Sequence, residues 1–280
     1  MHNTTYQTTP NRFVTARGAR YAYRTLGDKN QPTLLLLTHL AATMDNWDPL
    51  VLNTLSQNYH VIVFDNKGVG LTGGAVQSSM EGMAQGALAF MDAMRLDRVH
   101  LLGLSMGGMI AQELVKLAPE RVEKLILVGT GPKGGVGIEN IRPTTHFLTF
   151  KALRHAKDPK FYLFFNQDKT GRTKATQFLN RLKERTATKD KNITLHAYHR
   201  QLNVIKRWGQ ENENLMEHIQ VPTLIVNGDN DKMVPTENTY VLAQHIDNAK
   251  LIVYPNAGHG SLFQEPEQFC KDVVRFLETK

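Results

Sequence analysis

Short runs of consecutive apolar residues alternate along this chain with longer segments in which apolar residues recur every three or four positions. A continuous apolar run is typical of a strand buried on both faces, and the three-to-four spacing is typical of a helix packed on a core. Two short segments, 12–16 and 19–24, flank Arg17-Gly18 and predict a hairpin. The apolar runs follow at 33–38, 61–64, 99–103, 124–129, 223–226 and 251–254. The pattern therefore predicts a mostly parallel α/β sheet that begins with an antiparallel pair.

The regular alternation of strand and helix breaks after residue 129. Residues 130–137 hold four glycines and one proline, and no strand-like run follows until Thr223. Helical spacing is found in between, at 147–156, 160–165, 174–185 and 198–208. We therefore predict a helical segment, 132–215, inserted between the two parts of one core domain, 1–131 and 216–280.

Charge separates the inserted segment from the core. The chain has 33 Lys and Arg against 26 Asp and Glu, a net charge of +7. Residues 133–215 alone carry a net charge of +10, which leaves −3 for the rest. The basic residues are interleaved with apolar ones at helical spacing, which favours solvated helix faces over a nucleic-acid surface. An anionic substrate is the second interpretation of this charge.

Several classes of protein are not expected from this composition. No apolar run approaches the ~18 residues typical of a membrane span, and residues 1–7 show neither a basic nor an apolar leader region. The single cysteine, Cys270, excludes an intrachain disulfide and lies in a helical pattern typical of a buried thiol. No metal-binding or nucleotide-binding motif is found. We expect a cytoplasmic protein that acts on a small molecule without a metal, a cofactor, nucleic acid or a membrane, in an oligomeric state that the sequence does not indicate.

The stretch Gly103-Leu104-Ser105-Met106-Gly107 lies where a buried strand turns into a helix. Such a turn brings strand and helix close together, so small residues are needed two positions before and after the serine. The serine hydroxyl is then exposed at the turn, and the N–H of Met106 at the helix N-terminus faces any negative oxygen formed there. The pattern G-x-S-x-G is weak by itself and needs partners elsewhere in the chain.

Two further strand ends supply those partners. The run 223–226 leads into Gly228-Asp229-Asn230-Asp231, and the run 251–254 leads into Gly258-His259-Gly260. The carboxyl ends of parallel strands meet at one edge of a sheet, so a serine, an acid and a histidine are expected near each other. Asp229 competes with Asp231 for the acidic position.

On these motifs and their order, the chain resembles the α/β-hydrolase family over nearly its whole length. The resemblance implies an eight-stranded, mostly parallel sheet flanked by helices, with a helical cap after the sixth strand. It implies that Ser105, Asp231 and His259 are catalytic, with the spacing of the acidic motif favouring Asp231. It also implies that the amides of Met106 and Ala41 form an oxyanion hole.

One loop departs from the family pattern. The usual His-Gly pair after the first parallel strand is His39-Leu40 here, and leucine adopts a positive φ only at a cost. We expect either a differently bent loop or a more apolar wall beside the nucleophile, and a bracing role for His39. The turn that begins at Asp65 resembles the family's Asp-x-Arg-Gly-x-Gly-x-Ser turn, in which the carboxylate binds backbone amides.

The resemblance implies hydrolysis of a small carboxylic ester through an acyl-serine intermediate. Hydrolysis of a lactone or a carbon–carbon bond and cofactor-free perhydrolysis of the haloperoxidase type use the same residues and stay open. A protein that only binds or senses a ligand is the alternative of another class. For the substrate pocket the candidates are Leu40, Phe147 and Trp208.

Overall fold

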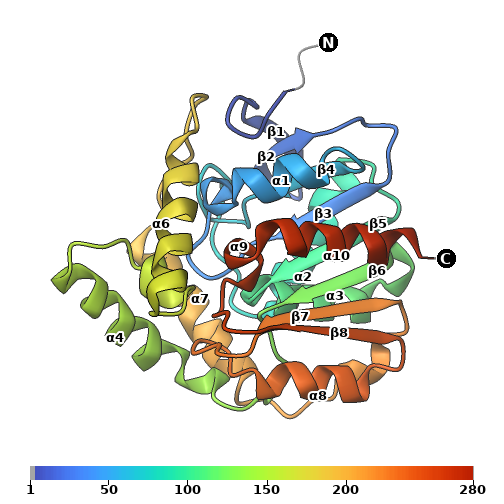
Figure 1. Cartoon of the computed structure of the whole chain (residues 1–280). Coiled ribbons are helices and arrows are strands. Elements are labelled where there is room, and N and C mark those ends of the chain that lie inside the picture. Colours follow the sequence, from blue (N-terminus) through green and yellow to red (C-terminus); the bar gives the residue numbers. More distant parts are fainter. Residues whose placement is uncertain (1–3, 280) are drawn as a thin grey trace.

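The computed structural model describes residues 4–279, so residues 1–3 and 280 of the predicted core ranges lie outside it. Its centre is one eight-stranded sheet in the order β1-β2-β4-β3-β5-β6-β7-β8 (Figure 1). Only β1 with β2 and β2 with β4 are antiparallel. The strands are β1 Arg12–Ala16, β2 Ala19–Leu26, β3 Thr33–Leu37, β4 His60–Phe64, β5 Val99–Leu104, β6 Val122–Val128, β7 Thr223–Gly228 and β8 Ala249–Tyr254. The predicted α/β sheet with its antiparallel start is confirmed.

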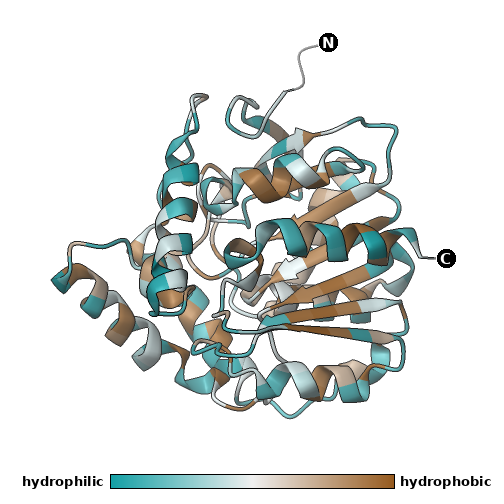
Figure 2. Cartoon of the chain, viewed as in Figure 1, coloured by the Kyte–Doolittle hydropathy of each residue, from teal (hydrophilic) through white to brown (hydrophobic). Residues whose placement is uncertain are grey.

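Helices cover both faces of the sheet because its central strands are apolar on both sides (Figure 2). The helices of the core are α1 Pro49–Leu55, α2 Met80–Ala93, α3 Met106–Leu117, α8 Glu237–His245, α9 Ser261–Gln264 and α10 Pro266–Glu278. Side chains of α2, α3 and α8 share one hydrophobic cluster with the sheet, and those of α1 and α10 share the other. The sheet is thus the middle of three layers.

Four helices lie between β6 and β7, within the predicted segment 132–215, which we call the cap. They are α4 Ile141–Arg154, α5 Lys160–Leu163, α6 Lys169–Lys183 and α7 Leu195–Trp208. Figure 1 shows them to one side of the sheet, with α4 at the outer edge. Helix α7 packs on α2, and α6 packs on α1 and α9, so the cap contacts helices from both faces.

Among residues 4–279, no helix is both long enough and apolar enough to cross a bilayer.

Candidate active site

Ser105 lies between the end of β5 and the first residue of α3, with φ +54° and ψ −117°. A positive φ is costly for a residue with a side chain and persists only where the surroundings enforce it. Here the enforcing contacts are close approaches of backbone. A Cβ on Gly107 would lie 2.2 Å from the carbonyl oxygen of Leu37, and one on Gly103 would lie 2.4 Å from that of Gly107. The two glycines are therefore required by the packing of α3 on β3 and β5.

Three side chains from separate strand ends are joined in a hydrogen-bonded row. The Nε2 atom of His259 lies 3.0 Å from Oγ of Ser105, and its Nδ1 atom lies 2.7 Å from Oδ2 of Asp231. All three side chains are buried, with 3–7% of each residue exposed. The carboxylate requires a proton on Nδ1, which leaves the lone pair of Nε2 facing the serine hydroxyl.

The structure also separates the two candidate acids. Asp231 accepts hydrogen bonds at Oδ1 from the amides of Met233 and Val234, at 2.8 and 3.0 Å, while its other oxygen faces His259. Asp229 is exposed, and its amide binds the carbonyl oxygen of Tyr254. Of the two candidate acids, only Asp231 is hydrogen-bonded to His259.

His39 braces the loop that follows β3. Its Nδ1 donates to the carbonyl oxygen of Leu40 at 2.8 Å, and its ring meets Phe164 edge to face at 4.9 Å. Burial lowers the pKa of the imidazole to about 3, so the ring is neutral at physiological pH. A histidine that uses its proton on a neighbouring carbonyl has a bracing role, as the sequence suggested.

A cavity of about 620 Å³ opens above the serine, between the sheet and the cap. Its floor includes His39, Ser105 and His259. The remaining lining is mostly apolar. Its apolar side chains from the cap include Ile141, Phe150, Leu153, Leu163, Phe164, Ile193 and Leu195, and the core adds Leu40 and Met233. Leu40 therefore lies where the sequence predicted it, in the wall of the cavity that holds Ser105.

The predictions that Phe147 and Trp208 line the pocket are wrong. Phe147 is 67% exposed on α4 and does not reach the cavity, whereas Phe150, one helical turn later, does. Trp208, the last residue of α7, is buried, and its indole N–H donates to the carbonyl oxygen of Gly131 at 3.2 Å. It lines a separate small cavity with Lys133 and Glu113. Sequence spacing indicated helices here but not which face of each helix turns towards Ser105.

Comparison with known proteins agrees with this geometry. Residues 32–266 match the family model described as alpha/beta hydrolase fold. The chain belongs to the α/β-hydrolase fold family.

Relatives of this α/β hydrolase cover nearly the whole chain. An alpha/beta hydrolase fold protein from Chitinophaga pinensis is 36% identical, with a TM-score of 0.92 over 99% of this chain and 100% of that one. A 2-hydroxy-6-oxononadienedioate/2-hydroxy-6-oxononatrienedioate hydrolase from Pseudomonas putida is 30% identical over 83% of this chain and 80% of its own. A 2-hydroxy-6-oxo-6-(2'-aminophenyl)hexa-2,4-dienoic acid hydrolase from Metapseudomonas resinovorans is 27% identical, over 96% and 91%.

The two predicted oxyanion amides differ in their surroundings. Met106 is the first residue of α3, where backbone N–H groups have no partner within the helix. The amide of Ala41 instead donates to Oε1 of Gln201, at 2.9 Å, and Ala41 itself carries the positive φ of this loop, +62°. Gln201 is a fully buried residue of α7 whose Nε2 has no hydrogen-bond partner. No motif pointed to Gln201, because it pairs with a backbone group 160 residues away.

Apart from histidines, the described lining of the cavity of this α/β hydrolase contains one pair of oppositely charged side chains. Among the described residues that line it, only Asp158 and Lys160 are charged, and Lys160 Nζ lies 3.1 Å from both carboxylate oxygens of Asp158. No other lysine or arginine of the described cap residues lines the cavity. The expectation of an anionic substrate, which rested on the cap's net charge, is not supported.

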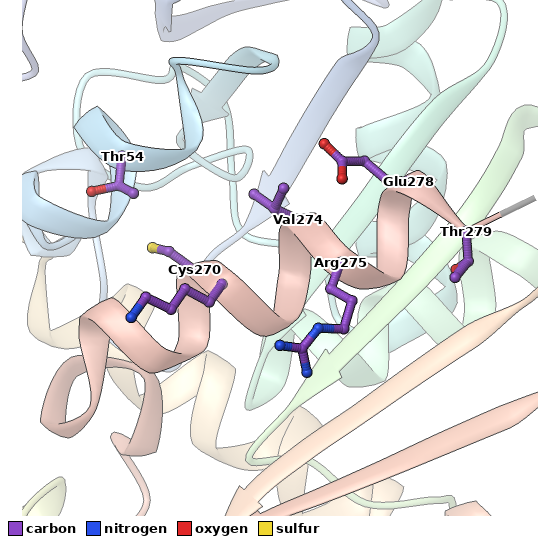
Figure 3. A pocket seen from close by; sticks show the side chains of 7 residues that line it. Thr54, Cys270, Val274, Arg275, Glu278 and Thr279 are labelled. Carbon is purple, nitrogen blue, oxygen red and sulfur yellow. The ribbon is translucent and has the colours of Figure 1, made fainter.

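A second groove lies on the surface between α1 and α10 and is separate from Ser105 (Figure 3). Cys270 lies at its base but is buried, and burial raises the pKa of its thiol to about 12. A thiol in that state is not nucleophilic, which agrees with a packing role. Among residues 4–279, no cluster of His, Cys, Asp and Glu has the arrangement of a metal site.

Proposed function

We propose that this α/β hydrolase cleaves a carboxylic ester in two steps through an acyl group on Ser105. The observation that carries the proposal is the row Ser105–His259–Asp231, with distances of 3.0 and 2.7 Å. A serine hydroxyl is a weak nucleophile at neutral pH and needs a base within hydrogen-bond reach. His259 is such a base, and its cation would be stabilised by the carboxylate of Asp231.

In the first step Oγ of Ser105 attacks the ester carbonyl while its proton passes to Nε2 of His259. The carbonyl oxygen becomes negative and receives a hydrogen bond from the amide of Met106, at the positive end of α3. The same proton then leaves with the alcohol. In the second step His259 removes a proton from water, and the water oxygen attacks the carbonyl carbon of the acyl-serine. The bond from that carbon to Oγ of Ser105 then breaks, His259 returns the proton to Oγ, and the acid is released.

The amide of Ala41 is proposed as the second oxyanion donor, and this requires its hydrogen bond to Gln201 to be exchanged for one to the substrate. Each donor of this kind is worth roughly 10²–10³ in rate. The exchange would couple the position of α7 in the cap to the chemistry at Ser105.

The cavity lining favours an uncharged ester over a dicarboxylate. The Pseudomonas putida relative is named for a dioate, which carries two carboxylate groups. In this chain the only cation of the described cavity lining, Lys160, is already paired with Asp158. A carboxylate buried among apolar side chains without a partner is strongly disfavoured.

Carbon–carbon bond hydrolysis is the second candidate, because two similar relatives carry names of hexadienoic or nonadienedioic acid hydrolases. Their substrates would meet the same serine and histidine. A direct comparison of kcat/KM for a neutral ester and for such an acid would separate the two functions. A cytoplasmic location and a lack of nucleic-acid binding stay predictions.

The test uses p-nitrophenyl butyrate and a fluorophosphonate that reacts with activated serines. We expect the wild-type protein to release p-nitrophenol and to gain the mass of one phosphonyl group on Ser105. Ser105→Ala is expected to lose both, whereas Ser78→Ala, at an exposed serine, keeps both. Ester turnover that survives in Ser105→Ala would refute the proposal. Labelling of Ser105 without turnover of any ester or acid would instead favour the ligand-binding alternative.

A further inference from the structure

Three apolar side chains that line the cavity above Ser105 are also largely open to solvent. Phe150 is 62% exposed, Leu153 is 67% exposed and Leu195 is 77% exposed. The first two lie on α4, and the third is the first residue of α7. We call these three residues the apolar rim. They belong to the same cavity as the nucleophile, so the rim is its outer end.

A large apolar side chain that is exposed to solvent does not contribute the free energy of stabilisation that its burial would provide. Scattered exposed leucines are ordinary, but a group of them gathered at the mouth of a pocket is typical of a binding surface. Figures 1 and 2 show α4, which is partly apolar, at the outer edge of the molecule and away from the sheet.

We propose that the apolar rim binds the distal part of a long acyl or alkyl chain of the substrate. This inference rests on the proposed ester hydrolase function and names its substrate class. The chain would run from the carbonyl carbon at Ser105 past the half-buried Leu163 and Ile193 to the rim. A short ester would fill the floor of the cavity and leave the rim exposed.

The chemistry of the lining agrees with this occupant. Between the floor and the rim the only charges of the described lining are Asp158 and Lys160, which neutralise each other at 3.1 Å. An alkyl chain needs no hydrogen-bond partner and gains free energy from each methylene group that it buries. The gain is at most roughly fourfold in affinity for each methylene group.

Phe147 distinguishes this occupant from a macromolecule. It is 67% exposed on the same helix as Phe150 but does not line the cavity. A second copy of the chain or a lipid surface that covered α4 would cover Phe147 as well. A substrate chain lying in the cavity would contact Phe150 and leave Phe147 in water.

The experiment compares Phe150→Ser, Leu153→Ser and Leu195→Ser, singly and together, with the matched control Phe147→Ser. The substrates are p-nitrophenyl butyrate and p-nitrophenyl decanoate, below the concentration at which the decanoate aggregates. We expect the triple variant to lower kcat/KM for the decanoate at least tenfold, mainly through KM, and to change that for the butyrate less than twofold. Phe147→Ser is expected to behave as the wild type with both.

An equal loss with both esters, or an equal loss in Phe147→Ser and Phe150→Ser, would overturn the proposal. A change in sedimentation velocity or in binding to phosphatidylglycerol vesicles that is shared by Phe147→Ser and Phe150→Ser, without a change in chain-length preference, would also overturn it. If no ester is hydrolysed, ethyl and decyl fluorophosphonates still test the rim through their labelling rates at Ser105. A decyl preference that the triple variant abolishes supports the rim even if the ester function fails.

Discussion

Two parts of the cavity differ in how they are built: its floor, which includes Ser105 and His259, and its roof, the lining that the cap contributes and that ends in the apolar rim. On the floor, Ser105 and His259 are at most 5% exposed and are held by hydrogen bonds from separate strand ends. On the roof, Phe150 and Leu195 are more than 60% exposed and contact solvent. Proton transfer depends on the positions of single atoms, whereas the binding of an alkyl chain depends on area. We therefore propose that the fold supplies the fixed geometry for the reaction and that the cap selects the substrate.

The largest expected effect comes from a substitution that changes the hydrogen bonds of the floor and leaves the roof unchanged. Asp231→Asn keeps the shape of the acid but removes its charge and allows the amide to donate, so that His259 is held in the wrong tautomer. We expect kcat to fall about 10⁴-fold with an almost unchanged KM. Initial rates with p-nitrophenyl butyrate measure both constants.

Asp229→Asn is the matched control for that variant, two positions earlier in the same loop. Its carboxylate is exposed and makes no contact with His259 in the structure. Activity within twofold of wild type is expected. If Asp229→Asn were the more damaging change, the assignment of the acid would have to be reversed.

The floor could be predicted because the backbone alone nearly determines it. Glycine is required at 103 and 107 because a Cβ there would lie only 2.4 and 2.2 Å from a main-chain oxygen, and such requirements are visible as residue types. Each strand end places its side chain at one edge of a parallel sheet, so the order Ser105, Asp231, His259 was sufficient to predict that they meet. Burial of the strands on both faces gave the apolar runs.

The roof could not be predicted in the same way. Helical spacing indicated α4 and α7 but not their rotation about the helix axis. Phe147 and Phe150 lie only about 60° apart around an α-helix, so a small rotation decides which of them faces the cavity, and Phe150 does. Trp208 was misplaced for the same reason. The contact of Gln201 could not be predicted because its partner is the main-chain amide of Ala41, and any residue type other than proline supplies such an amide.

A second prediction tests an ion pair that connects the cap to helix α3 of the core. Lys133, at the start of the cap, has its Nζ 2.9 Å from Oε1 of Glu113 in α3 and 2.6 Å from Oε2 of Glu213. Glu113 is 2% exposed. Lys133→Met would leave that carboxylate buried without a cation, which costs about 3–5 kcal/mol. Urea unfolding should therefore show a much lower free energy of unfolding.

The double variant Glu113→Gln with Lys133→Met removes the unpaired charge as well as the lysine. We expect it to recover at least half of the lost free energy of unfolding, because the remaining cost is that of lost packing and hydrogen bonds. Equal stability of the single and double variants would show that Glu113 is not what makes Lys133 necessary.

The smallest expected effect concerns pH and a second contact between the two regions. Asp190, in the cap between α6 and α7, lies against Asp65 at the end of β4, and Gly70 packs against both carboxylates. Burial first, and then the neighbouring Asp190, raise the pKa of Asp65 well above its ordinary value, although the amides of Met44 and Leu71 donate to it. A raised pKa in the folded state means that this contact favours folding at low pH and loses that contribution as the pH rises through the folded pKa.

Asp190→Asn removes the neighbouring charge, so it should stabilise the protein above the raised pKa and have little effect below the ordinary pKa of an aspartate. A gain of about 1 kcal/mol corresponds to about 2–4 °C in melting temperature for a chain of this size. Thermal unfolding at pH 8 and pH 3 measures the difference, with the exposed Asp247→Asn as control. The same shift at both pH values, or a shift shared with the control, would mean that the two carboxylates do not repel each other. A shift at pH 8 alone would show that repulsion between Asp65 and Asp190 weakens the contact of the cap with the sheet as the pH rises.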